Sequence, residues 1–213
     1  MSEDLKGKIL NKALELFNTY GYESVKMRDI SGALNISPGN LTYHYKKKDD
    51  IIYAIVQQQY RDHQNRKCAE NTTFEEINEL LKANVEHQKK YFFYFNNITE
   101  LPRKYPEIAK IQVEVKREFY NLLKEIFQNF IRKGLMKPEA VEGAYDDLAF
   151  AIISIVVFWT QETFLQNDFI PSPKDLISVV WNIIRPNITD AGIPFIPCCS
   201  KSIRTDNRLA RPQ

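Results

Sequence analysis

The stretch KMRDISGALNISPGNLTYHYKKK, residues 26–48, decides which fold the sequence predicts. In its first half, apolar residues such as Ile30 and Leu34 recur at helical spacing. A second helix start follows at Ser37 and Pro38. The serine hydroxyl can accept hydrogen bonds from free backbone amides, and proline at the first helical position loses no hydrogen bond that the helix needs. The stretch therefore predicts two short helices joined by a tight turn.

The second short helix presents polar side chains. Leu41 and Tyr45 are four residues apart and are predicted to face inward, because a helix this short needs packing against its neighbours to be stable. The residues left on its outer surface and amino-terminal end are Gly39, Asn40, Thr42, Tyr43 and His44. Two short helices with a turn of about three to four residues and a polar second helix fit a helix-turn-helix, whose second helix enters the major groove of DNA.

Positive charges surround these two helices. The cations are Lys26, Arg28, Lys46, Lys47 and Lys48, and the only acidic residue between the first and last of them is Asp29. Contact with DNA phosphates is the expected use, although a run of lysines is also typical of an ordinary solvated face. The agreement of cap, turn, inward pair and cations favours DNA. The residues that we predict to contact it are Lys26, Arg28, Ser37, Gly39, Asn40, Thr42, Tyr43, His44 and Lys48.

This region resembles the amino-terminal DNA-binding domain of TetR-type (TetR/AcrR-like) transcriptional regulators. The similar positions are Leu16, Phe17, Gly21, Tyr22, Asp29, Ile30, Ser31, Leu34, Ile36, Ser37, Leu41, Tyr45 and Lys48, which cover about the first quarter of the chain. The family usually has threonine where Lys26 stands. A charge contact with phosphate is therefore expected there in place of a hydroxyl contact. The resemblance implies double-stranded operator DNA as a partner.

Composition limits the remaining possibilities. The chain has 213 residues, of which 44% are hydrophobic and 26% charged, which suits a soluble globular protein of one or two domains. Its net charge of +2 means that any nucleic-acid site must be local. Cys198 and Cys199 are adjacent and Cys68 is isolated, which favours a reducing compartment. No apolar run is long enough for a signal peptide or a membrane span, so we expect a cytoplasmic protein without membrane contact.

Helical periodicity, with no alternating run of strand length, predicts an all-α protein: an N-terminal three-helix helix-turn-helix DNA-binding domain followed by a helical ligand-binding and dimerisation domain. The boundaries we predict are 1–47 for the DNA-binding domain, 48–71 for a linking helix, 72–190 for the second domain and 191–213 for an irregular tail. Three local expectations are more specific. Ser24 caps the first helix of the motif, one helix runs from Phe74 to Phe95, and another helical region opens at Pro138.

Two segments near the carboxyl terminus, 148–164 and 176–184, are apolar beyond a single stripe. Such helices are buried on more than one face. They are either central in a monomer core or paired with a second copy in a four-helix interface, and the resemblance implies the second arrangement. The residues that we predict at this interface are Ile152, Ile155, Val156, Trp159, Leu176, Val180, Trp181 and Ile184. A homodimer would bind a palindromic operator with half-sites about one helical turn apart.

The second domain also combines aromatic and polar positions on neighbouring helices. Plain core packing explains such a pattern, and so does an aromatic cavity for a small apolar or amphipathic effector, which the resemblance favours. The residues that we predict to bind this ligand are Asn84, Gln88, Tyr91, Phe92, Phe119, Tyr120, Leu123, Phe158 and Gln161.

Nothing in the sequence indicates an enzyme. Its histidines, His44, His63 and His87, share no metal-binding spacing, and no glycine-rich phosphate loop or serine elbow is present, so we expect no metal and no cofactor. The sequence therefore predicts a DNA-binding transcriptional regulator, a repressor released from its operator by ligand. The alternative is a helical small-molecule-binding or interaction protein that has lost operator binding.

Overall fold

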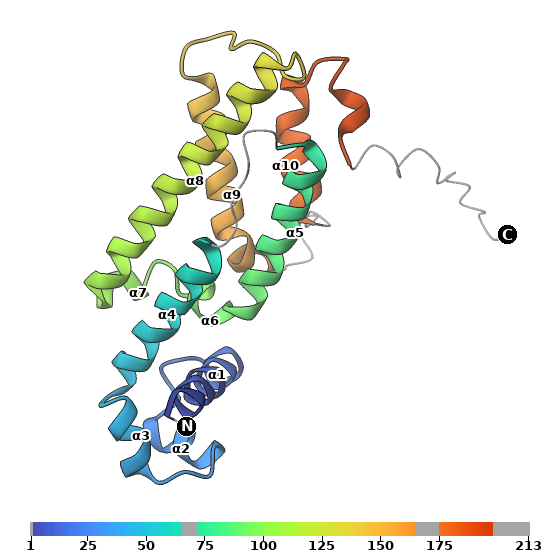
Figure 1. Cartoon of the computed structure of the whole chain (residues 1–213). Coiled ribbons are helices and arrows are strands. Elements are labelled where there is room, and N and C mark those ends of the chain that lie inside the picture. The colour runs from blue at the N-terminus through green and yellow to red at the C-terminus, as the bar shows by residue number, and fades with distance from the viewer. Residues whose placement is uncertain (1, 65–71, 165–174, 198–213) are drawn as a thin grey trace, which may run out of the picture. The chain divides into compact units, whose positions relative to one another are not determined.

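A computed structural model describes residues 2–64, 72–164 and 175–197, with side chains for 5–62, 72–159 and 175–197. All named elements in these ranges are helices, which confirms the all-α class (Figure 1). They are α1 (Ser2–Tyr20), α2 (Met27–Ala33), α3 (Pro38–His44), α4 (Lys48–Gln64), α5 (Phe74–Lys90), α6 (Phe92–Asn96), α7 (Leu101–Lys104), α8 (Pro106–Arg132), α9 (Ala144–Phe164), α10 (Leu176–Ile184) and the 3-10 turns η1 (Arg185–Asn187) and η2 (Ile193–Phe195).

The chain groups into two compact units that do not follow the chain order. Unit 1 comprises Met1–Lys67, Glu86–Glu118 and Val157–Gln166. Unit 2 comprises Cys68–Val85, Phe119–Val156 and Asn167–Gln213. The first four helices thus share a unit with α6 and α7, and the domain boundaries drawn from the sequence stay a prediction.

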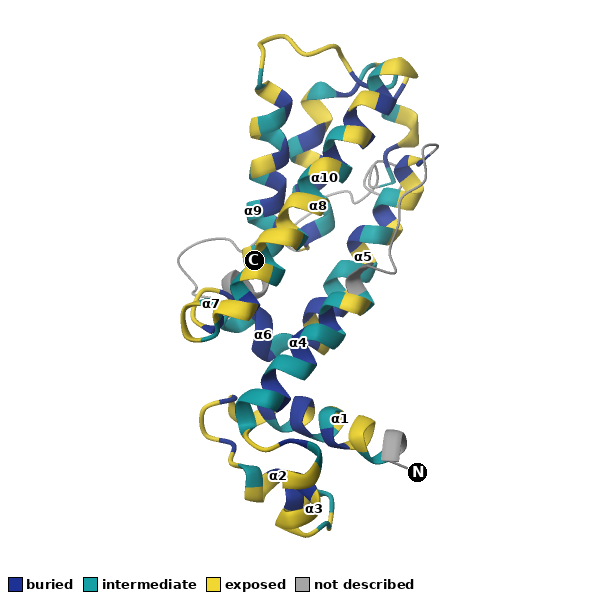
Figure 2. Cartoon of the chain, turned by 60° about the vertical axis from the view of Figure 1, so that its left-hand side comes forward, coloured by how far each residue is buried: buried dark blue, intermediate teal, exposed yellow. Residues whose placement is uncertain are grey.

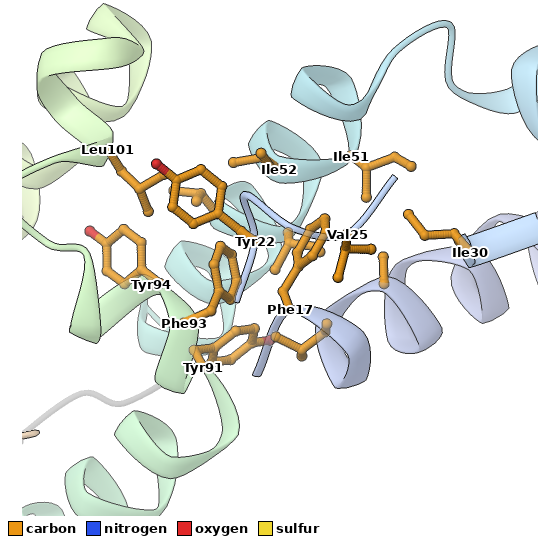
Figure 3. Packing of buried hydrophobic residues seen from close by; sticks show 14 of the residues in the cluster. Phe17, Tyr22, Val25, Ile30, Ile51, Ile52, Tyr91, Phe93, Tyr94 and Leu101 are labelled. Carbon is orange, nitrogen blue, oxygen red and sulfur yellow. The ribbon is translucent and has the colours of Figure 1, made fainter. Parts of the chain in front are cut away.

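The core of unit 1 explains this grouping. Phe17 of α1 and Tyr22 of the following loop lie against Phe93 of α6, with ring centroids 5.4 and 6.5 Å from that of Phe93 (Figure 3). Tyr22 and Phe93 are 2% and 1% exposed. The apolar faces of α1 to α4 are therefore completed by a side chain far away in the sequence. Other buried members of this core are Ile9, Ala13, Ile30, Leu41, Ile51, Ile52, Ile55 and Leu101.

The helix-turn-helix begins with a different cap from the one expected. The Asp29 carboxylate accepts a hydrogen bond from the backbone N–H of Lys26 at 2.7 Å, and Lys26 is the N-cap residue of α2. The Ser24 hydroxyl instead donates to the backbone carbonyls of Tyr20 and Gly21 at the end of α1. The prediction that Ser24 caps α2 is therefore wrong, because those carbonyls, freed where α1 ends, are nearer acceptors for its O–H.

The turn and the second helix of the motif follow the prediction. Asn35 has a positive φ of 52°, which asparagine tolerates better than most residues and which reverses the chain after α2. Ser37 is the N-cap residue of α3, and its Oγ accepts a hydrogen bond from the Asn40 N–H at 3.1 Å. Pro38 is the first helical residue. This confirms the predicted start of the second helix.

The predicted helix from Phe74 to Phe95 is in fact interrupted at Tyr91, between α5 and α6. The side-chain amide of Asn18, on α1, satisfies the backbone groups that the interruption leaves open. Its Nδ2 donates to the Lys90 carbonyl and its Oδ1 accepts from the Phe93 N–H, both at 2.9 Å. The correction has a tertiary cause, since the partner of this break lies more than seventy residues away in the chain.

We expect Asn18→Ala to lower the free energy of unfolding by about 1–3 kcal/mol, because it leaves a backbone donor and acceptor without their partner. Asn18→Asp removes only the donor, and it also places a carboxylate against the Lys90 carbonyl, so it should destabilise as well. The measurement is urea denaturation followed by circular dichroism. Asn11→Ala on the exposed side of α1 is the matched control. Equal midpoints for the two alanine variants would contradict this role.

Unit 2 has its own aromatic core. The ring centroid of Phe74, the first residue of α5, lies 4.4 Å from that of Phe130 and 5.4 Å from that of Trp181. The Trp181 indole N–H donates to Asn78 Oδ1 at 3.3 Å. A capping box precedes α5, in which the Glu76 carboxylate accepts from the Thr73 N–H at 2.7 Å. These contacts bring α5, α8 and α10 together.

One helix start in unit 2 differs from that predicted, and part of the predicted tail is described. The helix expected to open at Pro138 begins at Ala144 as α9, because Glu139 Oε1 accepts from the Tyr145 N–H at 2.8 Å and so caps the helix from a preceding loop. In the predicted irregular tail from Ala191, the described residues include η2, followed by Ile196, which is 2% exposed. Burial of the apolar Ile196 side chain stabilises the position of residues 193–197. The residues after 197 lie outside the described part.

Candidate nucleic-acid interface

The outer side of α3 is an exposed polar surface of the motif. Tyr43 is 84% exposed and Asn40 is exposed beside it, whereas Leu41 and Tyr45 are 1% and 6% exposed. Figure 2 shows the same division, with exposed residues along α2 and α3. The predicted inward pair is therefore confirmed. The polar side chains of α3 are available to a groove of DNA.

Hydrogen bonding within α3 separates its polar residues into two groups. The Thr42 hydroxyl donates back to the carbonyls of Pro38 and Gly39, at 3.0 and 3.1 Å. Its hydrogen is thus engaged by its own helix, which makes Asn40 and Tyr43 the stronger candidates for base contacts. Gly39 faces open space, since a Cβ added there would have only Ser37 Oγ within 4 Å, at 3.9 Å. Backbone can approach DNA closely at such a residue.

The cations of the motif are accessible. Arg28 is 77% exposed in its side chain and lies 3.8 Å from an Asp29 oxygen, and Lys47 is 67% exposed and lies 3.6 Å from Asp49. Exposed pairs at these distances contribute little and are easily exchanged for phosphate. Lys26 and Lys46 are exposed as well. His44 is half-buried, with its ring edge-on to Tyr43 at a centroid distance of 5.2 Å.

Lys48 is placed differently from the sequence prediction. Its ammonium group donates to three backbone carbonyls of the loop between α1 and α2. These belong to Tyr22, Glu23 and Val25, at 2.7, 3.1 and 3.1 Å. Burial, and then the nearby Lys104 ammonium, lower the pKa of Lys48. Because three backbone carbonyls accept from its half-buried ammonium, we propose that Lys48 supports the motif, while its phosphate contact stays a prediction.

Comparison with known proteins decides the family. Residues 9–55 match the family described as "Bacterial regulatory proteins, tetR family", and residues 56–193 match the one described as "Bacterial transcriptional repressor". The chain belongs to the TetR family. TetR-family proteins are DNA-binding regulators and not enzymes, as the sequence predicted.

Curated relatives include the biofilm operon icaADBC negative transcriptional regulator IcaR. The protein of Staphylococcus epidermidis is 38% identical over 53 residues, which are 25% of this chain and 29% of that protein. The protein of Staphylococcus aureus strain Newman is 24% identical over 138 residues, 61% of this chain and 67% of that one. The chain thus spans less than a third of the first relative's length and two thirds of the second's.

Solved structures of the TetR family share the fold. A regulator from Marinobacter aquaeolei VT8 has a TM-score of 0.80 at 24% identity, covering 94% of this chain and 98% of that one. CprB of Streptomyces coelicolor, solved in complex with its biological operator, has a TM-score of 0.64 at 16% identity, covering 93% and 96%. At such identities the likeness concerns the fold alone. In the described residues no helix is long and apolar enough to cross a membrane.

The residues predicted to bind an effector are divided between the two units of this TetR-family chain. Unit 1 contains Gln88, Tyr91, Phe92 and Phe158. Unit 2 contains Asn84, Phe119, Tyr120 and Leu123. The side chain of Gln161 lies outside the described residues. Phe158, 40% exposed, is at the surface and not in the interior where the pattern placed it, because apolar residues surround α9 on all sides and some must face outward.

Tyr91 is buried with no exposed surface, and its hydroxyl donates to Asp62 Oδ2 at 2.7 Å. Lys90 donates to the same oxygen, also at 2.7 Å. Burial raises the pKa of the Asp62 carboxyl, but the hydrogen bonds from Lys90 and Tyr91 outweigh it and the net pKa is lowered. Tyr91 therefore ties α4 to the end of α5. A ligand would reach its hydroxyl only by displacing that bond.

Most of the residues predicted at a dimer interface are already covered within one chain. Ile152, Val156, Leu176, Val180, Trp181 and Ile184 are between 1% and 7% exposed. Ile155 and Trp159 are half-buried. The six buried residues belong to the core of their own chain and have little surface left to bury on association. Periodicity alone cannot tell which neighbour covers an apolar face, and the dimer interface stays a prediction.

Several residues that support the interface gave no signal in the sequence. Asn18, on α1, bonds to the backbone around the start of α6, whereas Glu100 and Tyr105 bond to Tyr22 and Asp49 on either side of the helix-turn-helix. The partners in these bonds are 56 to 78 residues apart in the chain. The only cue is local, since Tyr105 precedes Pro106 at the start of a long helix. Polar residues of this kind are indistinguishable from solvated surface until the tertiary fold is known.

Proposed function

We propose that this TetR-family chain is a repressor that binds a palindromic operator as a homodimer and leaves it when a small apolar or amphipathic ligand binds. The observation that carries the proposal is the exposed polar side of α3, capped by Ser37 and flanked by cations that make only weak ion pairs. The name of IcaR as a negative regulator and the operator complex of CprB support the same role for this chain.

The roles of the contacting residues follow from their exposure. Lys26, Arg28 and Lys46 neutralise phosphates on either side of the groove, a contribution that is independent of sequence and dependent on salt. Asn40 and Tyr43 reach base edges from the amino-terminal half of α3 and its exposed side. An asparagine amide suits adenine in the major groove, because it can donate and accept together.

A buried acceptor in unit 1 supports a ligand with a polar end. Gln59 of α4 is 4% exposed, and its Nε2 lies 3.0 Å from His87 Nε2. Among the described residues, Gln59 Oε1 is a buried oxygen with no hydrogen-bond partner. A buried unpaired acceptor is unfavourable, so a ligand O–H or N–H placed there would gain a strong hydrogen bond.

The helix that carries Gln59 also follows the DNA-binding motif directly in the chain, since α3 ends at His44 and α4 starts at Lys48. Ligand would bind the conformation in which α4 is tilted. In that conformation the distance between the α3 helices of the two protomers would no longer match the distance between the operator half-sites. Operator affinity would then fall by the difference in ligand binding free energy between the two conformations.

A homodimer would use the outer side of the carboxyl-terminal helices. Phe150 of α9 is 59% exposed, and Ile177, Val179 and Ile183 of α10 are half-buried. Apolar residues left at the surface of helices this hydrophobic favour association with a second copy. Sedimentation velocity of the purified chain tests this part, and a monomer at micromolar concentration would contradict it.

The deciding experiment is selection from a pool of random DNA duplexes at two salt concentrations. We expect a palindrome with half-sites about one helical turn apart. Addition of candidate apolar and amphipathic compounds to that complex should then identify one that releases the DNA. Weak binding without sequence preference, lost at physiological salt, would instead favour the alternative of a small-molecule-binding or interaction protein that no longer uses an operator.

Two substitutions separate the roles of the contacting residues. Tyr43→Ala should lower affinity for the selected operator by about 10- to 100-fold with little effect on unrelated DNA, because it removes a base contact. Lys46→Met should weaken binding to every sequence alike. It should also reduce the magnitude of the salt slope, which is the slope of the logarithm of the DNA-binding constant against the logarithm of salt concentration, by about 1. Electrophoretic mobility shifts at several salt concentrations measure both. A uniform loss for Tyr43→Ala would remove its assignment to base recognition.

A further inference from the structure

We propose that Glu100, Lys104 and Tyr105, here called the α7 bracket, set the orientation of the helix-turn-helix by holding the chain at both of its ends. The inference rests on the proposed operator binding and adds positioning residues to it. All of the groups involved lie in unit 1, within Met1–Lys67 and Glu86–Glu118.

The first contact holds the chain just before α2. The Tyr22 hydroxyl donates to Glu100 Oε1 at 2.6 Å, and Figure 3 shows this hydroxyl directed towards the segment that carries Leu101. Lys104 lies over the Tyr22 ring, with Nζ 5.4 Å from the centroid, and 3.9 Å from a carboxylate oxygen of Glu23. The loop that enters the motif is therefore bound by a hydroxyl, a ring and a charge.

The second contact holds the chain just after α3. The Tyr105 hydroxyl donates to Asp49 Oδ1 at 2.8 Å, and Asp49 lies in the first turn of α4. One tyrosine belongs to the motif side and the other to the bracket, so the two hydrogen bonds run in opposite directions. Burial, and then the neighbouring carboxylate, raise the pKa of the Tyr22 and Tyr105 hydroxyls. Both groups therefore remain protonated donors at physiological pH.

Lys48 completes the arrangement, because its ammonium joins the start of α4 to the carbonyls of the loop before α2. Loop, first turn of α4 and bracket are thus linked pairwise, and the motif between them cannot turn without breaking one of the links. The bracket itself is anchored by Leu101, which has no exposed surface. Such a closed set of contacts resists rotation more than any single contact does.

The bracket is also placed to respond to the rest of the chain. Tyr105 immediately precedes Pro106, the first residue of α8, which is one continuous helix as far as Arg132 in unit 2. A shift or rotation of the start of α8 therefore displaces the Tyr105 hydroxyl and Glu100. Because their partners lie at the two ends of the motif, the displacement changes the angle of α3 rather than unfolding it.

Four variants test the bracket: Tyr105→Phe and Glu100→Ala, which each remove one hydrogen bond, Glu100→Gln, whose amide oxygen can still accept from Tyr22, and Tyr60→Phe. The last is the matched control, since it removes a hydroxyl that donates to a carboxylate, Glu118 Oε1 at 3.2 Å, elsewhere in unit 1. Each full-length variant is compared with the wild type by hydrogen–deuterium exchange and by binding to the selected operator, with and without one base pair inserted between its half-sites.

We expect Tyr105→Phe and Glu100→Ala to speed amide exchange in residues 27–44 by about 3- to 10-fold, with α10 unchanged as an internal reference. The preference for correctly spaced over expanded operator should fall by about the same factor. Glu100→Gln and Tyr60→Phe should behave like the wild type.

Three results would overturn the proposal. They are unchanged exchange in residues 27–44, a Glu100→Gln variant as impaired as Glu100→Ala, or faster exchange with an unaltered spacing preference, which would reduce the bracket to a structural support. The exchange measurement needs no DNA. Failure of the wild type to select any operator would therefore refute the proposed function separately, while the exchange data still decide whether the bracket holds the motif.

Discussion

Replacing Lys48 by methionine will lower the free energy of unfolding by about 2–4 kcal/mol, because the side chain keeps its length but loses a charged donor to three carbonyls. The carbonyls of Tyr22 and Val25 are partly buried at these contacts and cannot be fully rehydrated. Urea denaturation followed by circular dichroism gives the change. We expect the effect to be largest in the α1–α2 region, where hydrogen exchange should become faster.

Lys46→Met is the control for this prediction, since Lys46 is a neighbouring lysine at the exposed end of the same motif. It should leave stability within about 0.5 kcal/mol of the wild type while weakening DNA binding. Lys48→Met would then act mainly on stability, and Lys46→Met mainly on DNA binding. If Lys48→Met instead kept the stability of the wild type and reduced the salt slope of DNA binding, Lys48 would be a phosphate contact after all.

Phe93→Ala will destabilise the protein by about 3–5 kcal/mol, the range for truncating a buried phenylalanine. Phe93 is 1% exposed and contacts Phe17 and Tyr22. Its truncation therefore leaves a cavity in the core that α6 shares with the DNA-binding helices. We therefore expect loss of operator binding at temperatures where α10 and its neighbours in unit 2 remain folded. Thermal denaturation with hydrogen exchange of α2 and α3 measures both effects.

Phe195→Ala is the matched control, because Phe195 is 62% exposed and the same truncation leaves no cavity there. It should shift the denaturation midpoint by little. Phe93→Leu gives a milder version, with a loss of about 1–2 kcal/mol, should the alanine variant fail to fold. A DNA-binding motif that kept its stability in both Phe93 variants would show that α1 to α4 form an independent core.

Residues with local partners were predictable from the sequence. Ser37, Pro38 and Leu41 were predicted correctly, because caps and helical periodicity depend on neighbours within four residues along the chain. The exposed side of α3 follows from the same periodicity. For these elements the physical cause is local, so the sequence contains it in readable form.

Residues whose surroundings the sequence could not indicate have distant partners. Lys48 looked like one more surface cation until three carbonyls, 23 to 26 residues away, were found around its ammonium. The interruption at Tyr91 depends on Asn18, and the apolar residues of α9 and α10 turned out to be covered within their own chain. Charge, polarity and hydrophobicity say that a side chain needs a partner, but they do not say which one.

By itself, therefore, the sequence determined an all-helical protein with a capped, cation-flanked helix-turn-helix, because those properties arise from local hydrogen bonding and periodic burial. Only the tertiary structure decided what holds that motif in place. Its support comes from Asn18, Phe93, Glu100 and Tyr105, which lie at or near the breaks between α1, α5, α6, α7 and α8. Contacts between residues so far apart form only when the chain is folded, since one weak contact cannot offset the entropy lost in closing the long segment between its partners.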